Sequence, residues 1–141
     1  MQIYTIGYGK KSANEFFELI KQNEIDVLVD VRLYNSSQYA GYAKKADLQY
    51  FLDEICDCKY VHAPQFAPTA KLLDDYKNGR TSWAEYEVIY DALVTDVSYF
   101  EIFENVRICL LCAEEKPSQC HRRLLAEKIA QNYENVRVVH L

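Results

Sequence analysis

Short β-prone runs alternate along this chain with segments whose apolar residues have helical spacing, and no other feature constrains the fold as strongly. The β-prone runs are residues 2–6, 26–31, 59–62, 106–112 and 136–140. Strands that alternate with helices form a largely parallel sheet with right-handed crossovers and helices on both faces. We therefore predict a single α/β domain over residues 1–141, with a Rossmann-like three-layer α/β/α architecture and a mostly parallel sheet of about five strands.

Serine residues mark the expected starts of three helices. Ser12 with Glu15, and Ser82 with Glu85, have the spacing of a capping box, in which each side chain accepts or donates at the first helical turn. We also expect Ser118 to cap a helix that ends near residue 133. The other predicted helices are residues 48–55 and 72–76.

Composition and charge exclude several classes of protein. The chain has 141 residues, a normal size for one domain, and its net charge of −5 disfavours general attraction to nucleic acid while leaving room for a locally basic cleft. Long apolar stretches and a signal peptide are missing from the sequence, so we predict a cytoplasmic protein without membrane contact. Five cysteines, an odd number, favour thiols, metal ligands or small core residues over a disulfide framework.

Several residues that are costly to bury follow the predicted strand ends. In parallel sheets, ligands bind in the crevice beyond the carboxyl ends of the strands. The residues at these positions are Tyr8, Asp30, Arg32, His62, Cys112, Glu114, Cys120, His121 and Arg122. We expect a functional site at this rim, centred on residues 112–122, whereas His62 and His140 are interpreted as structural histidines.

The start of the last predicted helix brings reactive side chains to a positive electrostatic environment. Cys120 and His121 are expected in its first turn, where unpaired amide groups and the helix dipole favour negative charge, and Arg122 adds to the effect. Cys120 is then a candidate thiolate, or the helix start holds a phosphate or carboxylate. The alternative is that Cys120 is a small core residue, since free cysteine is often buried.

Two carboxylates near the rim are candidates for proton transfer or substrate binding. Asp30 and Arg32 point to the same side of an extended chain, which permits either a structural ion pair or joint work on a substrate. Glu114 is the best candidate general base because it follows a strand end near a helix start, although a solvated loop carboxylate explains it equally well.

Two cysteines and a histidine near the start of the last predicted helix are possible metal ligands. Cys112, Cys120 and His121 are three soft ligands on one loop, but their spacing differs from a zinc knuckle and no fourth ligand is evident. A metal-dependent protein is therefore only a third hypothesis. Cys56 and Cys58 are interpreted as packing residues.

A tyrosine-rich segment suggests a different kind of ligand. Between residues 32 and 45, Tyr34, Tyr39 and Tyr42 are interleaved with basic residues. Such a segment either stacks nucleobases and attracts phosphates or is a surface loop that uses tyrosines as partial lids.

Three motifs resemble a known protein family. They are Thr5-Ile6-Gly7-Tyr8, Leu28-Val29-Asp30-Val31-Arg32 and Cys112-Ala113-Glu114-x-x-Pro117-x-x-Cys120-His121-Arg122. On these residues the chain resembles the bacterial and archaeal family catalogued as domain of unknown function 488. The resemblance implies a compact Rossmann-like α/β/α domain, implies no reaction, and raises the expectation that the motif residues are functional.

Three hypotheses about function follow. The first is an enzyme that acts on a phosphate-bearing or nucleotide-like ligand, with Arg32 and Arg122 holding the anion, Cys120 or Glu114 performing the chemistry and His121 assisting. The second is a nucleic-acid-binding or sensing module without catalysis, and the third is the metal-dependent protein. Tyr8, Cys112 and Asp30 belong to the predicted site, while the cofactor and the oligomeric state are left open.

Overall fold

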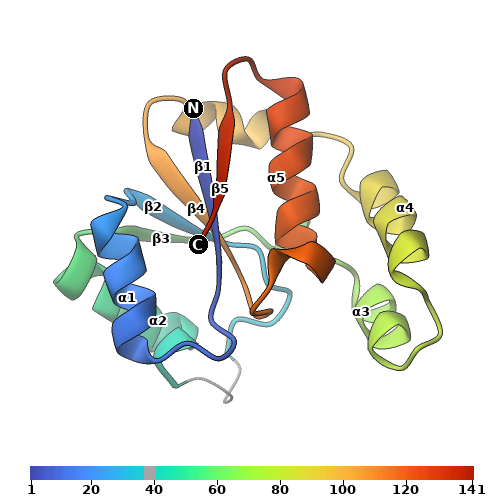
Figure 1. The fold of residues 1–141 in the computed structure, drawn as a ribbon, viewed down its shortest axis with the longest axis horizontal. Helices are drawn as coiled ribbons and strands as arrows, with labels where there is room; N and C mark the ends of the chain where they lie inside the picture. The colour runs from blue at the N-terminus through green and yellow to red at the C-terminus, as the bar shows by residue number, and fades with distance from the viewer. Residues whose placement is uncertain (37–40) are drawn as a thin grey trace.

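Five parallel strands form the centre of the protein in the computed structural model, which describes residues 1–36 and 41–141 (Figure 1). The strands are β1 (Gln2–Gly7), β2 (Val27–Asp30), β3 (Lys59–His62), β4 (Arg107–Cys112) and β5 (Arg137–His140). Their order in the sheet is β3-β2-β4-β1-β5, and each adjacent pair is parallel. The predicted three-layer α/β fold with a parallel sheet of about five strands is confirmed.

Helices connect the strands at or near the predicted positions. They are α1 (Ala13–Gln22), α2 (Lys45–Phe51), α3 (Ala70–Lys77), α4 (Trp83–Leu93) and α5 (His121–Asn132). Short 3-10 turns lie at Gly41–Ala43, Pro64–Phe66, Ser98–Phe103 and Pro117–Gln119, and a π-helical turn at Leu52–Cys56 extends α2. None of the described helices has the length and apolar character needed to cross a membrane.

The predicted capping box forms in full at the start of α4, while at the start of α1 only the half in which Ser12 caps the helix is present. The Ser12 hydroxyl accepts a hydrogen bond from the backbone amide of Glu15, and Ser82 and Glu85 satisfy each other's backbone amides reciprocally. Each contact satisfies an amide that the first turn of a helix otherwise leaves unpaired. Signals within four residues of each other therefore predicted correctly where these two helices begin.

The start of α5 differs from the prediction. Ser118 lies inside the 3-10 turn Pro117–Gln119, and Cys120 is the residue that precedes α5, in an extended conformation with φ −140° and ψ 140°. The amide of Cys120 donates to the carbonyl of Pro117, which closes the tight turn before the chain extends and the helix begins. The prediction that Ser118 caps α5 is wrong because Pro117 starts a separate turn.

Two apolar cores lie on opposite faces of the sheet. Helices α1 and α2 cover one face, while α5, with α4 and α3 beyond it, covers the other (Figure 1). Side chains of β4 alternate between the two cores, with Ile108 and Leu110 in one and Cys109 and Leu111 in the other. The same alternation turns Cys112, the last residue of β4, toward the side of the sheet where α5 begins.

Candidate functional site

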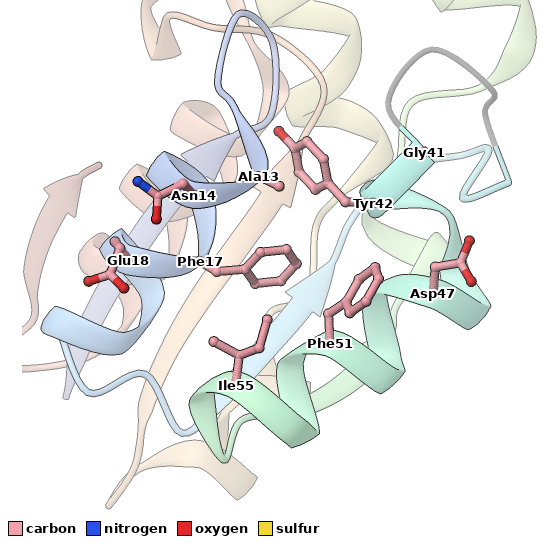
Figure 2. A pocket seen from close by; sticks show the side chains of 9 residues that line it. All are labelled: Ala13, Asn14, Phe17, Glu18, Gly41, Tyr42, Asp47, Phe51 and Ile55. Carbon is pink, nitrogen blue, oxygen red and sulfur yellow. The ribbon is translucent and has the colours of Figure 1, made fainter.

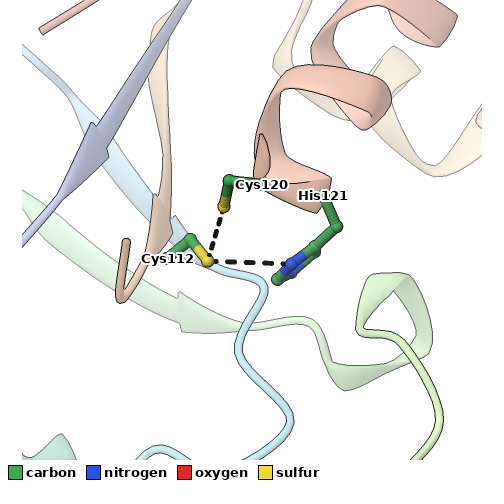
Figure 3. Close-up of side chains that lie close together, drawn as sticks. All are labelled: Cys112, Cys120 and His121. Atoms are coloured by element: carbon green, nitrogen blue, oxygen red, sulfur yellow. Dashed lines mark hydrogen bonds between the residues drawn. The ribbon is translucent and has the colours of Figure 1, made fainter. Parts of the chain in front are cut away.

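Two thiols and an imidazole meet where β4 ends and α5 begins (Figure 3). The Sγ atoms of Cys112 and Cys120 are 2.8 Å apart, and Cys112 Sγ lies 3.6 Å from Nδ1 of His121. The three side chains are buried, with 5%, 2% and 5% of their surface exposed. The first two of them are eight positions apart in sequence, so the fold is what brings them into contact.

A backbone contact determines which nitrogen of His121 carries hydrogen. Nε2 lies 2.7 Å from the carbonyl oxygen of Val31, and because a carbonyl only accepts, Nε2 is the donor. In the neutral ring Nδ1 is therefore unprotonated and faces Cys112. His121 is thus placed to take the proton of the Cys112 thiol, as in other cysteine–histidine pairs.

The direction of each pKa shift places the negative charge on Cys112. The hydrogen bond donated by Cys120 lowers the pKa of Cys112, and the charge and hydrogen bond of His121 lower it further. Burial and the neighbouring Cys112 raise the pKa of Cys120. Burial works against a charged His121, but the Cys112 thiolate raises the pKa of its imidazole overall. Cys120 was the predicted thiolate, whereas the structure favours Cys112 with Cys120 as its donor.

The same three residues are the metal alternative of the sequence analysis. Their ligand atoms all lie within 4.8 Å of one another, and no fourth ligand joins them among the described residues. Two thiolates on a tetrahedral zinc ion are separated by about 3.8 Å, given a Zn–S bond of about 2.3 Å. The sulfurs lie closer together than this, at 2.8 Å, and Cys120 is the donor of the contact between them.

A buried ion pair forms the second half of the site. Arg32 donates from Nε and Nη2 to the two carboxylate oxygens of Asp30 at 2.9 and 2.8 Å, and Nη2 also donates to the carbonyl of Ala43 at 2.8 Å. Tyr60 donates to Asp30 Oδ2 at 2.5 Å. The structural ion pair that the sequence allowed is thus present, and Asp30 is satisfied inside the protein.

One nitrogen of Arg32 is left over from this pairing. Nη1 has no hydrogen-bond partner among the described residues. Water does not replace the missing partner easily, because only 4% of the Arg32 side chain is exposed. The guanidinium carbon also lies 5.3 Å from the centre of the Tyr8 ring, within range of a cation–π contact. Burying an unsatisfied donor costs about 1–3 kcal/mol, so an acceptor atom beside Nη1 would be stabilising.

The thiols, the imidazole and Arg32 line a single pocket of about 320 Å³. Tyr8 and Glu114, two further predicted residues, lie on its wall as well. The rest of the lining is rich in aromatic rings, contributed by Tyr34, Tyr76, Trp83 and Tyr86. The rings on α3 and α4 were not predicted as pocket residues, because aromatic residues at helical spacing are usually core residues. Their clustering at residues 76–86 was the only feature of the sequence that could have indicated an aromatic pocket wall.

Arg122 points away from this pocket. It is fully buried, and its nitrogens donate to the carbonyls of Glu114 at 2.6 Å and Glu115 at 3.3 Å and to the hydroxyl of Thr5 at 3.4 Å. These contacts tie the loop after β4 to β1. Of the two arginines predicted to hold an anion, only Arg32 lines the pocket. Asp30, the partner of Arg32, is not among the lining residues.

The tyrosine-rich segment divides into residues with different environments. Tyr34 is 67% exposed at the pocket, whereas the hydroxyl of Tyr42 donates to the carbonyls of Lys11 at 2.8 Å and Tyr8 at 3.3 Å. Tyr42 therefore fastens the loop, and Tyr39 lies outside the described residues. His62 has a structural contact too, donating from Nε2 to the carbonyl of Arg32 at 2.9 Å.

A larger hollow of about 570 Å³ lies between α1 and α2 (Figure 2). Phe17, Phe51 and Ile55 point into it, with Glu18 and Asp47 at its margin. None of the described residues that line it is a thiol, an imidazole or a buried charge. This hollow is the larger of the two, but the thiols, the imidazole and the buried Arg32 line the pocket with Cys112.

Among known proteins, the chain matches the model of one protein family. The family model described as "Domain of unknown function DUF488" matches residues 12–129, which is most of the chain. Searches of the curated proteins and of the solved structures found no match.

Proposed function

The chain belongs to the DUF488 family, and from its geometry we propose that it is an enzyme that acts on a nucleotide-like ligand through the Cys112 thiolate. The observation that carries the proposal is the meeting, in one pocket, of the Cys112–His121 pair with Arg32, whose Nη1 has no hydrogen-bond partner among the described residues. A nucleophile with a base in contact is what covalent catalysis requires, and a neighbouring guanidinium can hold the ligand.

Cys112 is the proposed nucleophile. Its Sγ adds to an electrophilic carbon of the ligand, the bond to the leaving group breaks, and the protonated Nδ1 of His121 supplies the proton that the leaving group needs. Glu114, an exposed carboxylate on the pocket wall, is proposed to activate the water that releases the product. Cys120 keeps Cys112 ionised by donating its hydrogen bond.

Aromatic walls support a ligand with a planar ring. Trp83 and Tyr86 are stacked with their ring centres 4.7 Å apart, and they stand on the pocket with Tyr76 and Tyr34. Stacking on aromatic side chains contributes about 1–3 kcal/mol per nucleobase and tolerates different bases. The proposal therefore assigns the heterocyclic part of the ligand to these rings.

Arg32 supports an acceptor oxygen more strongly than a free phosphate. Its positive charge is already balanced by Asp30, so the pocket gains a directed N–H donor from Nη1 without a full unpaired charge. We expect a nucleoside monophosphate and its nucleoside to bind with similar affinity, and inorganic phosphate alone to bind weakly. Strong loss of binding with added salt would instead favour the nucleic-acid alternative.

Trp83 is the only tryptophan of the sequence, so its fluorescence tests the proposal directly. Titration with a nucleoside monophosphate, a nucleoside and inorganic phosphate should give saturable quenching with the first two only. Arg32→Lys keeps the charge beside Asp30 but removes Nη1, and should weaken binding about tenfold. Arg107→Lys, at the opposite end of β4, is the matched control. No quenching by any of the three probes would refute the proposed ligand class.

A further inference from the structure

We propose that Cys112 and Cys120 are an oxidation site, at which a hydroperoxide converts the two thiols reversibly into a disulfide. The formation of this bond is independent of the proposed enzyme activity. Its consequence, removal of the nucleophile and hence inactivation, rests on the proposed function.

The distance between the sulfurs carries the inference. The two Sγ atoms lie 2.8 Å apart, and a disulfide bond of about 2.05 Å requires them to approach by less than about 1 Å. Both residues lie at element ends, Cys112 at the end of β4 and Cys120 just before α5, so closing the bond needs no shift within a regular helix or strand interior. The remaining thiols have other contacts, since Cys56 donates to the carbonyl of Phe17 and Cys58 to that of Lys59.

An oxidant can reach the pair through the pocket. Cys112 and Cys120 are buried by the usual measure of exposure, but both lie on the pocket wall with Tyr8 and Glu114. A hydroperoxide is small enough to enter a space of about 320 Å³. Cys109, in contrast, is fully buried within the core on the other face of the sheet.

The first step is attack by the Cys112 thiolate on the peroxide. An S–O bond forms and the O–O bond breaks, so that the sulfur is oxidised by two electrons and becomes a sulfenic acid. The peroxide is reduced to an alcohol, or to water when hydrogen peroxide is the oxidant. The proton that this product needs comes from Nδ1 of His121, which faces Cys112.

The second step closes the disulfide. Cys120 Sγ attacks Cys112 Sγ, an S–S bond forms, the S–O bond breaks, and the thiol proton of Cys120 leaves with the hydroxide as water. A dithiol reductant restores both thiols by exchange. Cys112 is thus the residue that reacts with peroxide, and Cys120 is the residue that resolves the intermediate.

Peptide mass spectrometry of the wild-type protein tests the bond itself. After brief exposure to hydrogen peroxide and blocking of the free thiols, three of the five cysteines should be blocked. Cys112 and Cys120 should be joined in one peptide pair, lighter by two hydrogens and restored by dithiothreitol. Recovery of both residues as blocked thiols, or a bond to any other cysteine, would overturn the proposal.

Two variants test the assigned order of reaction. In Cys120→Ser the intermediate cannot be resolved, so Cys112 should accumulate as a sulfenic acid that dimedone traps. In the matched control Cys56→Ser, which removes a half-buried thiol outside the pocket, the disulfide should form at the wild-type rate. Absence of dimedone labelling in folded Cys120→Ser would show that Cys112 does not attack first, whatever the wild-type result.

These measurements need no substrate, so the two proposals can fail separately. If the disulfide forms but no nucleotide-like probe quenches Trp83, the oxidation site stands and the proposed function falls. If the probes bind and the thiols stay reduced in peroxide, the ligand pocket stands and the oxidation site falls.

Discussion

A single hydrogen bond decides the chemistry available to His121. Because Nε2–H donates to the carbonyl of Val31, Nδ1 is the atom that can exchange a proton with Cys112. A glutamine amide can imitate the donating Nε2 but offers nothing at Nδ1. A substitution of His121 by glutamine therefore separates the two roles of the imidazole, which are the contact with Val31 and the acceptance of a proton from Cys112.

His121→Gln should slow the alkylation of Cys112 by iodoacetamide about tenfold or more near pH 6, while the protein stays folded. The thiolate is the reactive form, and a lowered pKa keeps it populated below the usual thiol pKa of about 8.5. As pH falls, the wild-type rate should be lost only on passing through the lowered pKa of Cys112. The His121→Gln variant should lose its alkylation rate at a higher pH than the wild-type protein does. Identical pH profiles for the two proteins would show that His121 does not ionise Cys112.

Arg32→Met should lower the free energy of unfolding by about 3–5 kcal/mol, because it leaves the fully buried Asp30 without its partner. Urea denaturation measures the change. The control is Arg107→Met, which removes a solvent-exposed ion pair with Glu24 and should cost no more than about 1 kcal/mol. Equal costs for the two substitutions would show that the Asp30–Arg32 pair is not a buried structural contact.

At the scale of elements, the site is assembled by the approach of the loop after β4 to the end of β1. Gly7 pairs with Cys112 in the sheet, and the carbonyls of this loop accept hydrogen bonds from Arg122. A side chain at position 7 would meet the backbone directly, since a Cβ there would lie 1.6 Å from the carbonyl oxygen of Glu114. The glycine is therefore required by close packing.

Gly7→Ala should destabilise the protein by about 3 kcal/mol or more and displace the loop that carries Glu114. Gly41→Ala is the natural control, because a Cβ at that position has no atom within 4 Å. This substitution should change the free energy of unfolding by less than about 0.5 kcal/mol. Thermal unfolding of the two variants gives the comparison. A Gly7→Ala protein as stable as Gly41→Ala would mean that the loop does not pack against β1 as described.

Element starts also show how far local sequence signals reach. Capping boxes correctly predicted where α1 and α4 begin, because both partners of each contact are close in sequence. Ser118 had the same chemistry but was overridden by the turn that starts at Pro117. A capping residue identifies a helix start only when the backbone before it is free to adopt the extended conformation.

For the whole molecule, the order of strands and helices was enough to predict the architecture and the edge of the sheet at which several of the candidate residues meet. Alternation of β-prone and helical segments allows few topologies, and parallel strands place their carboxyl ends together. The direction of individual side chains was not predictable in this way. Arg32 and Arg122 are both buried arginines near strand ends, yet only tertiary contacts decide that one faces the pocket and the other holds a loop.

The aromatic wall of the pocket could not be predicted for a related reason. Trp83 and Tyr86 have the spacing of an ordinary buried helical face, and their exposure to the pocket depends on how α4 packs against α5 and α3. Trp83 is half-buried and Tyr86 is buried, and both line the pocket together with Cys112. The proposed ligand specificity thus depends on how several helices pack, whereas the proposed nucleophile lies at the end of one strand.

The rate at which iodoacetamide labels Cys112 near pH 6, with and without a saturating nucleoside monophosphate, tests the central claim most directly. We predict that Cys112 is labelled at least about tenfold faster than Cys56, and that the nucleotide slows this labelling because it occupies the same pocket. Labelling of Cys112 no faster than that of Cys56, and unaffected by the nucleotide, would contradict the account.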